Sequence, residues 1–341
     1  MGSNEDVLDG FWKAGRTFLN VRYAIMGGAM SWISEHNLVA AVSNAGGFGV
    51  IAGGAMPPEL LKREIVETKA LTKNSFGVNL ITMHPQLDAL MDVCIEEKVS
   101  HVILAGGIPS GQAVKKLKDV GIKVMCFAPA LVLAKRLVKT GADALILEGT
   151  EAGGHIGPVA TNILVQEILP HIKDVPVFVA GGIGSGEMMA AFLSMGASGC
   201  QIGTHFVCTK ECIAHPNFKK AFIQANARDA VPTVQIDPRF PVIPVRAIAN
   251  EGTKRFMEFQ MEMIQKYQNG EMELKDAQMA IEHYWGGALR RAVIDGDVEN
   301  GSLMAGQSVG LVKEEKTVQA VIDELVSSAA VSLRQLEQAA V

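Results

Sequence analysis

Short apolar segments alternate with longer segments of helical period along the first two thirds of the chain. From Tyr23 onward, each short run is rich in apolar or β-branched residues and is followed by glycine-rich punctuation. The runs are apolar on both faces, as expected for parallel strands that helices cover. Eight strands are predicted: Tyr23–Met26, Gly49–Ile51, Phe76–Leu80, His101–Leu104, Lys123–Phe127, Ala144–Leu147, Val175–Ala180 and Gly199–Ile202.

The segments between these strands carry apolar residues at positions i, i+3 and i+4, which is typical of amphipathic helices. Examples are Pro57–Thr72, Gly111–Val120, Leu131–Thr140 and Gly186–Met195. Eight strand–helix units in a row favour a closed barrel over an open doubly wound sheet. The pattern therefore predicts an α/β fold, a (β/α)8 TIM barrel with a small helical insertion/C-terminal domain.

The alternation stops after the eighth strand. Residues Asp229–Asn250 are rich in proline and extended in character. We expect residues 1–228 plus 301–341 to form the barrel, and residues 229–300 to form an extended segment and a small helical domain. Three helical patterns follow the extended segment: Gly252–Asn269, Glu271–Trp285 and Val318–Ser332.

Composition narrows the class of partner. The chain has 341 residues, of which 48% are hydrophobic and 20% are charged, so it is long and apolar enough to bury a substantial core. Its formal net charge of −5 offers no general attraction for nucleic acid or for an anionic bilayer. We therefore expect a small-molecule substrate, with no nucleic acid partner.

Cysteine usage and the apolar stretches bear on location. Five cysteines, an odd number in a long chain, fit reduced thiols better than a secreted disulfide framework. The N-terminal residues are acidic and lack a continuous apolar region, so no signal peptide is predicted. No apolar stretch reaches the ~18 residues of a membrane span. We expect a cytoplasmic protein that does not enter a membrane.

Glycine pairs follow the ends of several predicted strands. In a barrel all of these positions lie at the C-terminal rim, where active sites are built. Any single pair is explained by a loop that needs a positive φ angle. Five on one rim are better explained by a flat, phosphate-bearing cofactor that lies against the backbone. These glycines are Gly27, Gly28, Gly106, Gly107, Gly153, Gly154, Gly181, Gly182 and Gly203.

The loops after strands seven and eight predict a phosphate site. Gly181-Gly182 and Gly203-Thr204 stand where many barrels bind phosphate with backbone N–H groups, and the phosphate of FMN would fit there. The Thr204 hydroxyl adds a donor. The segment Gly47–Ala52 matches a dinucleotide-binding pattern in letters, but it leads into a strand instead of leaving one.

His155 is the candidate catalytic residue. It lies among glycines in the loop after strand six, and its pKa range suits proton transfer or hydrogen bonding near neutrality. Glu148, at the end of that strand, would bind a ribityl hydroxyl or a ring nitrogen, or else only cap the loop. A lone loop histidine is more often structural, but the neighbouring glycines leave few other side chains for chemistry.

A second cluster imitates a zinc site. His205, Cys208, Cys212 and His215 fall within eleven residues, yet their spacing matches no standard finger or ribbon. Cys94, Cys126 and Cys200 lie in apolar contexts and are expected in the core. We therefore predict no metal.

Four segments together carry a resemblance to a known family. The chain resembles the nitronate monooxygenase (2-nitropropane dioxygenase) family of FMN-dependent TIM barrels over roughly residues 20 to 225, with a weaker match at Ser302–Gln307. The same segments look equally like flavin-dependent enoyl-acyl-carrier-protein reductase, a sister group. The segments are Glu148–Gly157, Val179–Gly186, Gln201–Phe206 and Ala214–Pro216.

This resemblance implies roles for individual residues. It implies His155 as the active-site histidine, Asn79 as a hydrogen-bonding partner of the flavin, and Gln307 as a residue that reaches the flavin from the returning segment. The chain departs from its relatives in two places: Gly27-Gly28-Ala29 replaces a common glutamine-glycine-glycine, and His205 replaces a frequent basic residue. The remaining cofactor-binding residues implied are Gly27, Gly28, Ala29 and Met30 at the isoalloxazine, Gly153 and Gly154 under the cofactor, and Gly181, Gly182, Gly203 and Thr204 at the phosphate.

The expected activity is that of an FMN-dependent oxidoreductase, with FMN as cofactor. The favoured reaction is the oxidation of alkyl nitronates by O2, with His155 holding the nitro oxygens or acting as base. The alternative is NAD(P)H-dependent reduction of an enoyl thioester or a quinone. A second alternative, from a different class, is a barrel that binds a phosphorylated ligand without redox chemistry. O2 and NAD(P)H both remain open as redox partners, and a homodimer is one assembly that we consider.

Overall fold

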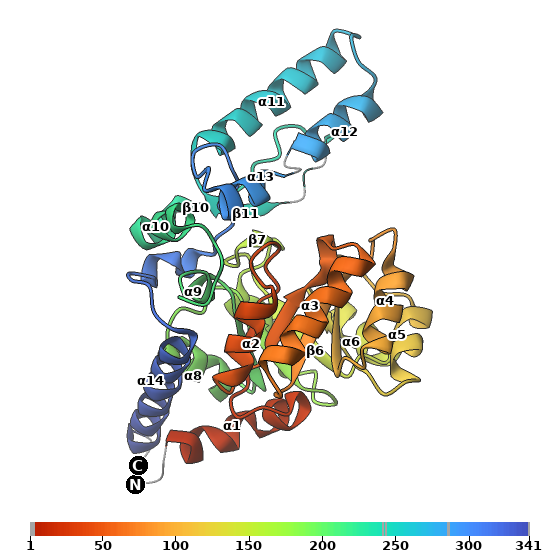
Figure 1. Cartoon of the computed structure of the whole chain (residues 1–341). Helices are drawn as coiled ribbons and strands as arrows, with labels where there is room; N and C mark the ends of the chain where they lie inside the picture. The colour runs from red at the N-terminus through yellow and green to blue at the C-terminus, as the bar shows by residue number, and fades with distance from the viewer. Residues whose placement is uncertain (1–3, 241, 243, 285–286, 340–341) are drawn as a thin grey trace.

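Eight parallel strands form a barrel in the computed structural model, which describes residues 4–240, 242, 244–284 and 287–339 (Figure 1). Neighbouring strands follow the order β1-β9-β8-β6-β5-β4-β3-β2, and a parallel bridge between Met26 and Phe48 joins the two ends. The sequence-based prediction of a (β/α)8 TIM barrel is confirmed. The strands are β1 (Ile25–Gly27), β2 (Gly49–Ala52), β3 (Phe76–Ile81), β4 (His101–Ala105), β5 (Lys123–Phe127), β6 (Ala144–Glu148), β8 (Val177–Ala180) and β9 (Gly199–Ile202).

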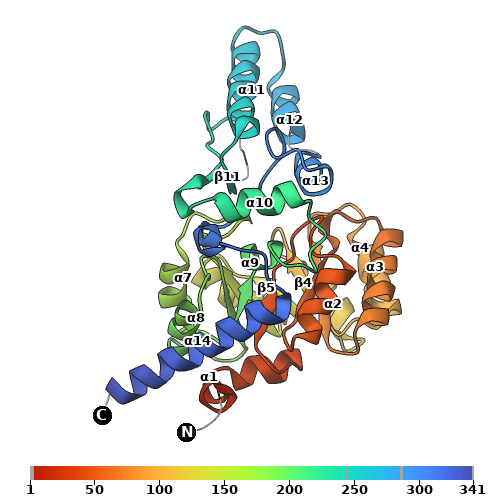
Figure 2. The same ribbon diagram turned by 60° about the vertical axis from the view of Figure 1, so that its left-hand side comes forward.

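Helices surround the barrel, and their apolar faces pack on its strands in one continuous core. Figure 2 shows this ring from the side of α14. The helices are α2 (His36–Asn44), α3 (Pro58–Leu71), α4 (Leu87–Glu96), α5 (Gly111–Lys118), α6 (Leu131–Thr140), α7 (Thr161–Ile168), α8 (Gly186–Ser194) and α14 (Val318–Ala339). The short helix α9 (Thr204–Val207) follows the last strand, and α10 (Pro216–Gln224) lies above the barrel, beneath residues 245–284. Short 3-10 or π turns lie at Gly53–Ala55, Ala227–Asp229, Arg291–Asp295 and Gln307–Leu311, and α13 spans Ala288–Arg290.

An N-terminal helix, α1 (Asn4–Leu19), closes the end of the barrel opposite the glycine-rich rim; the sequence analysis did not anticipate it. Its last carbonyls lack partners within the helix, and the Phe18 carbonyl accepts hydrogen bonds from His101 Nε2 at 2.9 Å and from Lys123 Nζ at 2.6 Å. The His101 ring also packs edge-on against the rings of Phe18 and Phe48. This end of the barrel is therefore sealed, which leaves the opposite rim for a ligand.

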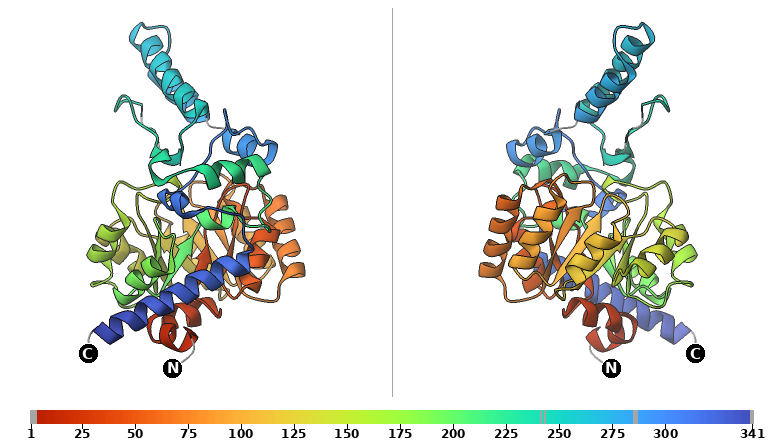
Figure 3. Two further views of the ribbon diagram at one scale, coloured as in Figure 1. Left: turned by 90° about the vertical axis from the view of Figure 1, so that its left-hand side faces the viewer. Right: turned by 90° about the vertical axis from the view of Figure 1, so that its right-hand side faces the viewer.

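A small antiparallel sheet and a helical hairpin stand on the C-terminal ends of the barrel strands (Figure 3). The sheet has the order β10-β11-β7, and the hairpin has an apolar core of its own that includes Phe240, Phe256 and Ile281. We call β10 (Ala230–Pro232), β11 (Val245–Ile248), α11 (Glu251–Gln268) and α12 (Leu274–Tyr284) the cap. β7 (Gly154–His155) is the edge strand that belongs to the loop after β6.

Most predicted elements agree with the structure to within three residues, but the last helix, α14, ends at Ala339 instead of Ser332. β1 and β8 each begin two residues later than expected, and α12 begins at Leu274 instead of Glu271; its predicted end at Trp285 lies outside the described residues. The three-stranded sheet was missed because β7 and β10 have three residues or fewer, and because β10 and β11 lie in a proline-rich segment. The predicted domain boundaries at residues 229 and 300 stay a prediction.

The five cysteines are free and buried. Among the helices that the structure describes, none has both the length and the apolar character that crossing a bilayer requires.

Candidate active site

The loop after β1 brings backbone to the centre of the rim. Gly27 N–H donates to the Phe48 carbonyl at 2.9 Å, and Gly28 N–H donates to the Ile202 carbonyl at 2.8 Å. A Cβ atom on Gly28 would lie 3.4 Å from Gly203 Cα, so the loops after β1 and β9 approach each other closely. Ala29 and Met30 follow, partly buried against the core. The predicted residues of this loop therefore lie together at the mouth of the barrel.

A serine fixes the shape of that loop. Ser34 Oγ donates to the Gly28 carbonyl at 2.8 Å and accepts a hydrogen bond from Met30 N–H at 3.0 Å. Since the serine is buried, both bonds are shielded from water. The sequence analysis missed Ser34, because a single serine in a loop carries no distinguishing signal.

The proposed phosphate loops lie beside this segment. Gly181 and Gly182 have φ angles of +91° and +72°, which side chains rarely adopt, so these two positions need glycine. Thr204 Oγ1 accepts a hydrogen bond from Gly306 N–H at 3.1 Å and keeps its own hydroxyl proton for a ligand. A Cβ on Gly203 would meet only Met30 Sδ, at 3.6 Å, so there is open space above this glycine.

Two polar side chains at the mouth lack ordinary partners. Asn79, on β3, is 8% exposed, and its Oδ1 atom is buried without a hydrogen-bond partner. Glu148 ends β6, and burial raises the pKa of its carboxyl to about 8, although solvent reaches part of the residue. The carboxyl is therefore protonated at neutral pH and can donate a hydrogen bond. An unpaired amide oxygen and a neutral acid fit a ligand with polar ring atoms or hydroxyl groups.

His155 stands on the edge strand β7. Its backbone pairs with Val245 of β11, and the neighbouring Gly154 has a φ of +76°. Much of the residue is accessible to solvent, yet the surrounding protein displaces enough water to lower the pKa of the imidazole. The ring is therefore neutral at pH 7 and carries one N–H donor and one acceptor.

Residues 302–307, the returning segment that leads from the cap back to the barrel, complete the mouth. Gln307 N–H donates to the Glu151 carbonyl at 2.9 Å, and a Cβ on Gly153 would lie 2.6 Å from Ala305 C and from Gly306 N. This contact explains the need for glycine at position 153, because only a bare backbone fits against residues 305–306. Residues about 150 positions apart in the chain thus form one wall.

Two further residues of this wall were missed in the sequence. The Glu151 carboxylate accepts hydrogen bonds from Thr161 N–H at 2.9 Å and from Thr161 Oγ1 at 2.8 Å, and so it anchors the loop after β6 to α7. Arg246 lies in the middle of β11, buried, and donates to the Thr150 carbonyl at 2.8 Å. An arginine inside an apolar run was the available signal for Arg246.

Two residues of the imitation zinc site, Cys208 and His215, have other partners, whereas the buried Nδ1 of His205 has none among the described residues. Cys208 Sγ donates to the Lys219 carbonyl, and His215 Nδ1 accepts from Asn217 N–H at the start of α10. Burial raises the pKa of Cys208 to about 12 and that of Cys212 to about 11, which keeps both thiols protonated. These contacts favour structural roles.

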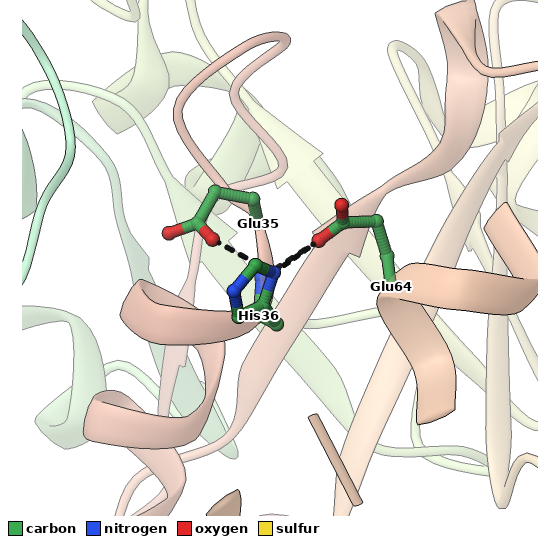
Figure 4. Close-up of side chains that lie close together, drawn as sticks. All are labelled: Glu35, His36 and Glu64. Atoms are coloured by element: carbon green, nitrogen blue, oxygen red, sulfur yellow. Dashed lines mark hydrogen bonds and ion pairs between the residues drawn. The ribbon is translucent and has the colours of Figure 1, made fainter. Parts of the chain in front are cut away.

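Another cluster has the residue types of a metal site. In the described part of the chain, Glu35, His36 and Glu64 are the one group of three potential ligands with atoms within 4.8 Å of one another (Figure 4). His36 Nδ1 lies 2.7 Å from Glu64 Oε2 and 3.0 Å from Glu35 Oε2. Burial alone lowers the pKa of His36, but the hydrogen bond to Glu64 and the nearby carboxylates raise it overall. The contacts of this imidazole with the carboxylates account for the group as a structural link that joins α2 to α3.

Comparison with solved structures agrees with the fold. FabK from Thermotoga maritima superposes with a TM-score of 0.85 and 37% sequence identity, covering 95% of this chain and 97% of that one. Nitroalkane oxidase from Streptomyces ansochromogenes superposes with a TM-score of 0.77 at 24% identity, covering 93% and 98% of the two chains, and shares the fold.

Comparison with curated sequences gives the family. A probable nitronate monooxygenase of Staphylococcus saprophyticus is 30% identical over 358 residues, covering 91% of this chain and 96% of the relative. A (3aS,4S,5R,7aS)-5-hydroxy-7a-methyl-1-oxo-octahydro-1H-indene-4-carboxyl-CoA dehydrogenase of Rhodococcus jostii is 29% identical, covering 91% and 94%. The family model described as nitronate monooxygenase matches residues 14–92 and 86–328. Because this match spans the barrel and the cap, the chain is an oxidoreductase that belongs to the nitronate monooxygenase family.

Proposed function

We propose that this protein is an FMN-dependent nitronate monooxygenase that oxidises alkyl nitronates with O2. The observation that supports the proposal is the place of His155 on β7, in the glycine-flanked loop after β6, together with burial that lowers the pKa of its imidazole. The family model and the Staphylococcus saprophyticus relative support this reaction class.

The residues at the rim fit FMN. Gly181, Gly182, Gly203 and Thr204 would hold the phosphate, since their loops offer backbone N–H groups, a free hydroxyl proton and open space. Asn79 would pair its orphaned Oδ1 with a ring N–H of the flavin. When bound, FMN supplies the electron acceptor and the reaction with oxygen, which no side chain of the protein provides.

The chain's own residues bind and orient the substrate. The neutral imidazole of His155 donates an N–H bond to a nitronate oxygen, or accepts a proton from a neutral nitroalkane. Glu148 assists because its carboxyl is protonated at neutral pH, so it does not repel an anion. The cap stands over this end of the barrel (Figure 1).

A second candidate is NAD(P)H-dependent reduction of an enoyl thioester or a quinone. The 37% identity to FabK over nearly the whole chain and the likeness to a dehydrogenase named for a carboxyl-CoA compound favour it. In that reaction His155 would donate its N–H to the carbonyl oxygen of the substrate. Both candidates use the histidine as a donor to an oxygen that carries negative charge.

Anaerobic mixing separates the two candidates. We expect the purified protein to be yellow with non-covalent FMN, and we expect an alkyl nitronate to bleach the flavin while NADH and NADPH do not. Bleaching by NADH or NADPH but not by a nitronate would refute the nitronate monooxygenase reaction and favour the second candidate. A colourless protein that takes up no added FMN would refute both and leave the non-redox alternative.

A variant tests the histidine itself. His155→Ala should keep its flavin and its melting temperature, because the residue lies on an exposed loop, while turnover per bound flavin falls by about 10²-fold. His171→Ala, an exposed histidine after α7, is the matched control and should behave like the wild type. Full activity of His155→Ala would remove His155 from the mechanism.

A further inference from the structure

Arg246 is a buried arginine whose guanidinium donates to two main-chain carbonyls and to one hydroxyl. The residue is 5% exposed; its Nε donates to the Thr150 carbonyl at 2.8 Å, its Nη1 to the Ala230 carbonyl at 2.6 Å and its Nη2 to Thr150 Oγ1 at 3.5 Å. Within the described residues, no carboxylate oxygen lies within ion-pair distance of this guanidinium; burial lowers its pKa, and the charge of Glu151 opposes that shift. Buried arginines are rare unless they form an ion pair, so the hydrogen bonds of Arg246 are expected to have a structural or functional role.

The two carbonyls belong to different parts of the fold. Thr150 is in the loop that leaves β6 of the barrel, and Ala230 begins β10 of the cap. The planar guanidinium reaches both, because its N–H groups point in fixed, separate directions. Arg246 therefore ties the barrel loop to the cap sheet.

The strand that carries Arg246 also holds His155. Val245 pairs with His155 and Arg246 pairs with Gly154, and Ile156 N–H donates to the Pro244 carbonyl at 3.0 Å. In the described part of the chain, the backbone hydrogen bonds of Gly154–Ile156 go to this cap strand and none goes to the barrel. The position of the histidine is thus set by the cap.

The edge of β11 that carries the histidine loop also meets the returning segment. Ala247 forms an antiparallel bridge with Met304, and Ile248 N–H donates to the Leu303 carbonyl at 2.9 Å. β11 therefore pairs with β10 along one edge, and its other edge holds both the histidine loop and the returning segment. Without the arginine, the Thr150 end of the histidine loop loses its side-chain tie to this strand.

We propose that Arg246 is a positioning residue, which sets the distance of His155 from the barrel mouth by tying the Thr150 carbonyl to the cap. The inference rests on the role proposed above for His155. It assigns to the cap a part in catalysis that goes beyond covering the mouth.

The test compares Arg246→Met with Arg255→Met in the flavin-loaded protein. Arg255 is the matched control because it is exposed on α11 and its one ion pair, with Glu251, is on the surface. The readout is the imidazole titration of His155 by NMR, assigned with a His155→Gln variant. We expect the pKa of His155 to rise toward 6.5 in Arg246→Met, as water reaches the ring, and to stay low in Arg255→Met.

Turnover is measured on the same samples. We expect kcat per bound flavin to fall by about tenfold or more in Arg246→Met with KM little changed, because a misplaced group costs rate more than binding. A folded Arg246→Met with the wild-type His155 titration would overturn the inference. A shifted titration with unchanged turnover would support the positioning and instead refute the catalytic role of His155.

A milder substitution keeps the test valid if Arg246→Met does not fold. Arg246→Lys keeps the charge, but a single ammonium does not reproduce the planar fork that reaches Thr150 and Ala230 together. We expect a smaller shift of the His155 pKa in the same direction, and a smaller loss of turnover. A wild-type titration in this variant would overturn the inference.

Discussion

The contact between Gly153 and the returning segment gives a quantitative prediction. In Gly153→Ala the new Cβ would stand 2.6 Å from Ala305 C and from Gly306 N, whereas ordinary contacts begin at 3.4 Å. Both neighbours are backbone atoms, so one of the two segments has to move by about 0.8 Å. Overpacking of this kind costs about 1–3 kcal/mol.

The same movement disturbs the bonds that hold the wall of the mouth. Gly306 N–H donates to Thr204 Oγ1 and Gln307 N–H donates to the Glu151 carbonyl, at 3.1 and 2.9 Å. We therefore expect the melting temperature to fall by about 2–12 °C, at the roughly 2–4 °C per kcal/mol of large domains. Turnover per bound flavin should fall by up to about 10²-fold, since a displacement near 1 Å is enough for that loss.

Gly157→Ala is the control for this prediction. Gly157 lies in the same loop, and nothing stands within 4 Å of its added Cβ, so its stability should stay within about 0.5 kcal/mol of the wild type. Calorimetry gives the melting temperature of each variant, and flavin absorbance gives the bound flavin by which turnover is divided. Equal melting temperatures and equal turnover would refute the steric reasoning.

Three further predictions concern the phosphate loops, the flavin ring and pH. In Gly203→Asp the side chain has room beside Met30, but its carboxylate faces the proposed phosphate site. FMN should therefore bind about 30-fold to 100-fold more weakly in a titration. An unchanged affinity would place the phosphate elsewhere. Asn79→Leu removes an unpaired buried oxygen, so the melting temperature should stay the same or rise, while FMN affinity drops by about 2-fold to 10-fold. A lower melting temperature with full FMN affinity would contradict the pairing of Asn79 with the flavin ring. Burial lowers the pKa of His101 to about 4, so below pH 6.5 the unfolded chain binds a proton that the folded chain does not bind. About 3 kcal/mol of the free energy of unfolding should therefore be lost between pH 6.5 and 4. Urea titrations of His101→Gln over this range should show a smaller loss, and the same pH dependence in both proteins would exclude His101 as the cause.

The sequence by itself determined the barrel, because strand and helix periods are local properties. Lys123–Phe127 and Leu131–Thr140 were predicted with their observed bounds, since each is closed by residues that end its element. Gly141, for example, takes a φ of +110° after that helix, a conformation in which glycine is preferred. The glycine pairs also placed the candidate site on one rim, because all parallel strands of a barrel end on the same side.

Tertiary structure alone decided how the site is assembled. Nothing in the sequence near Gly153 shows that Ala305 lies against it, because that contact joins segments about 150 residues apart. The pKa of Glu148 likewise depends on burial by other strands, and no local pattern reports how much water surrounds a carboxyl. The pairing of His155 with Val245 joins a two-residue strand in the loop after β6 to a four-residue strand in the proline-rich segment. Local propensity is weak in both, so long-range hydrogen bonds choose the partner.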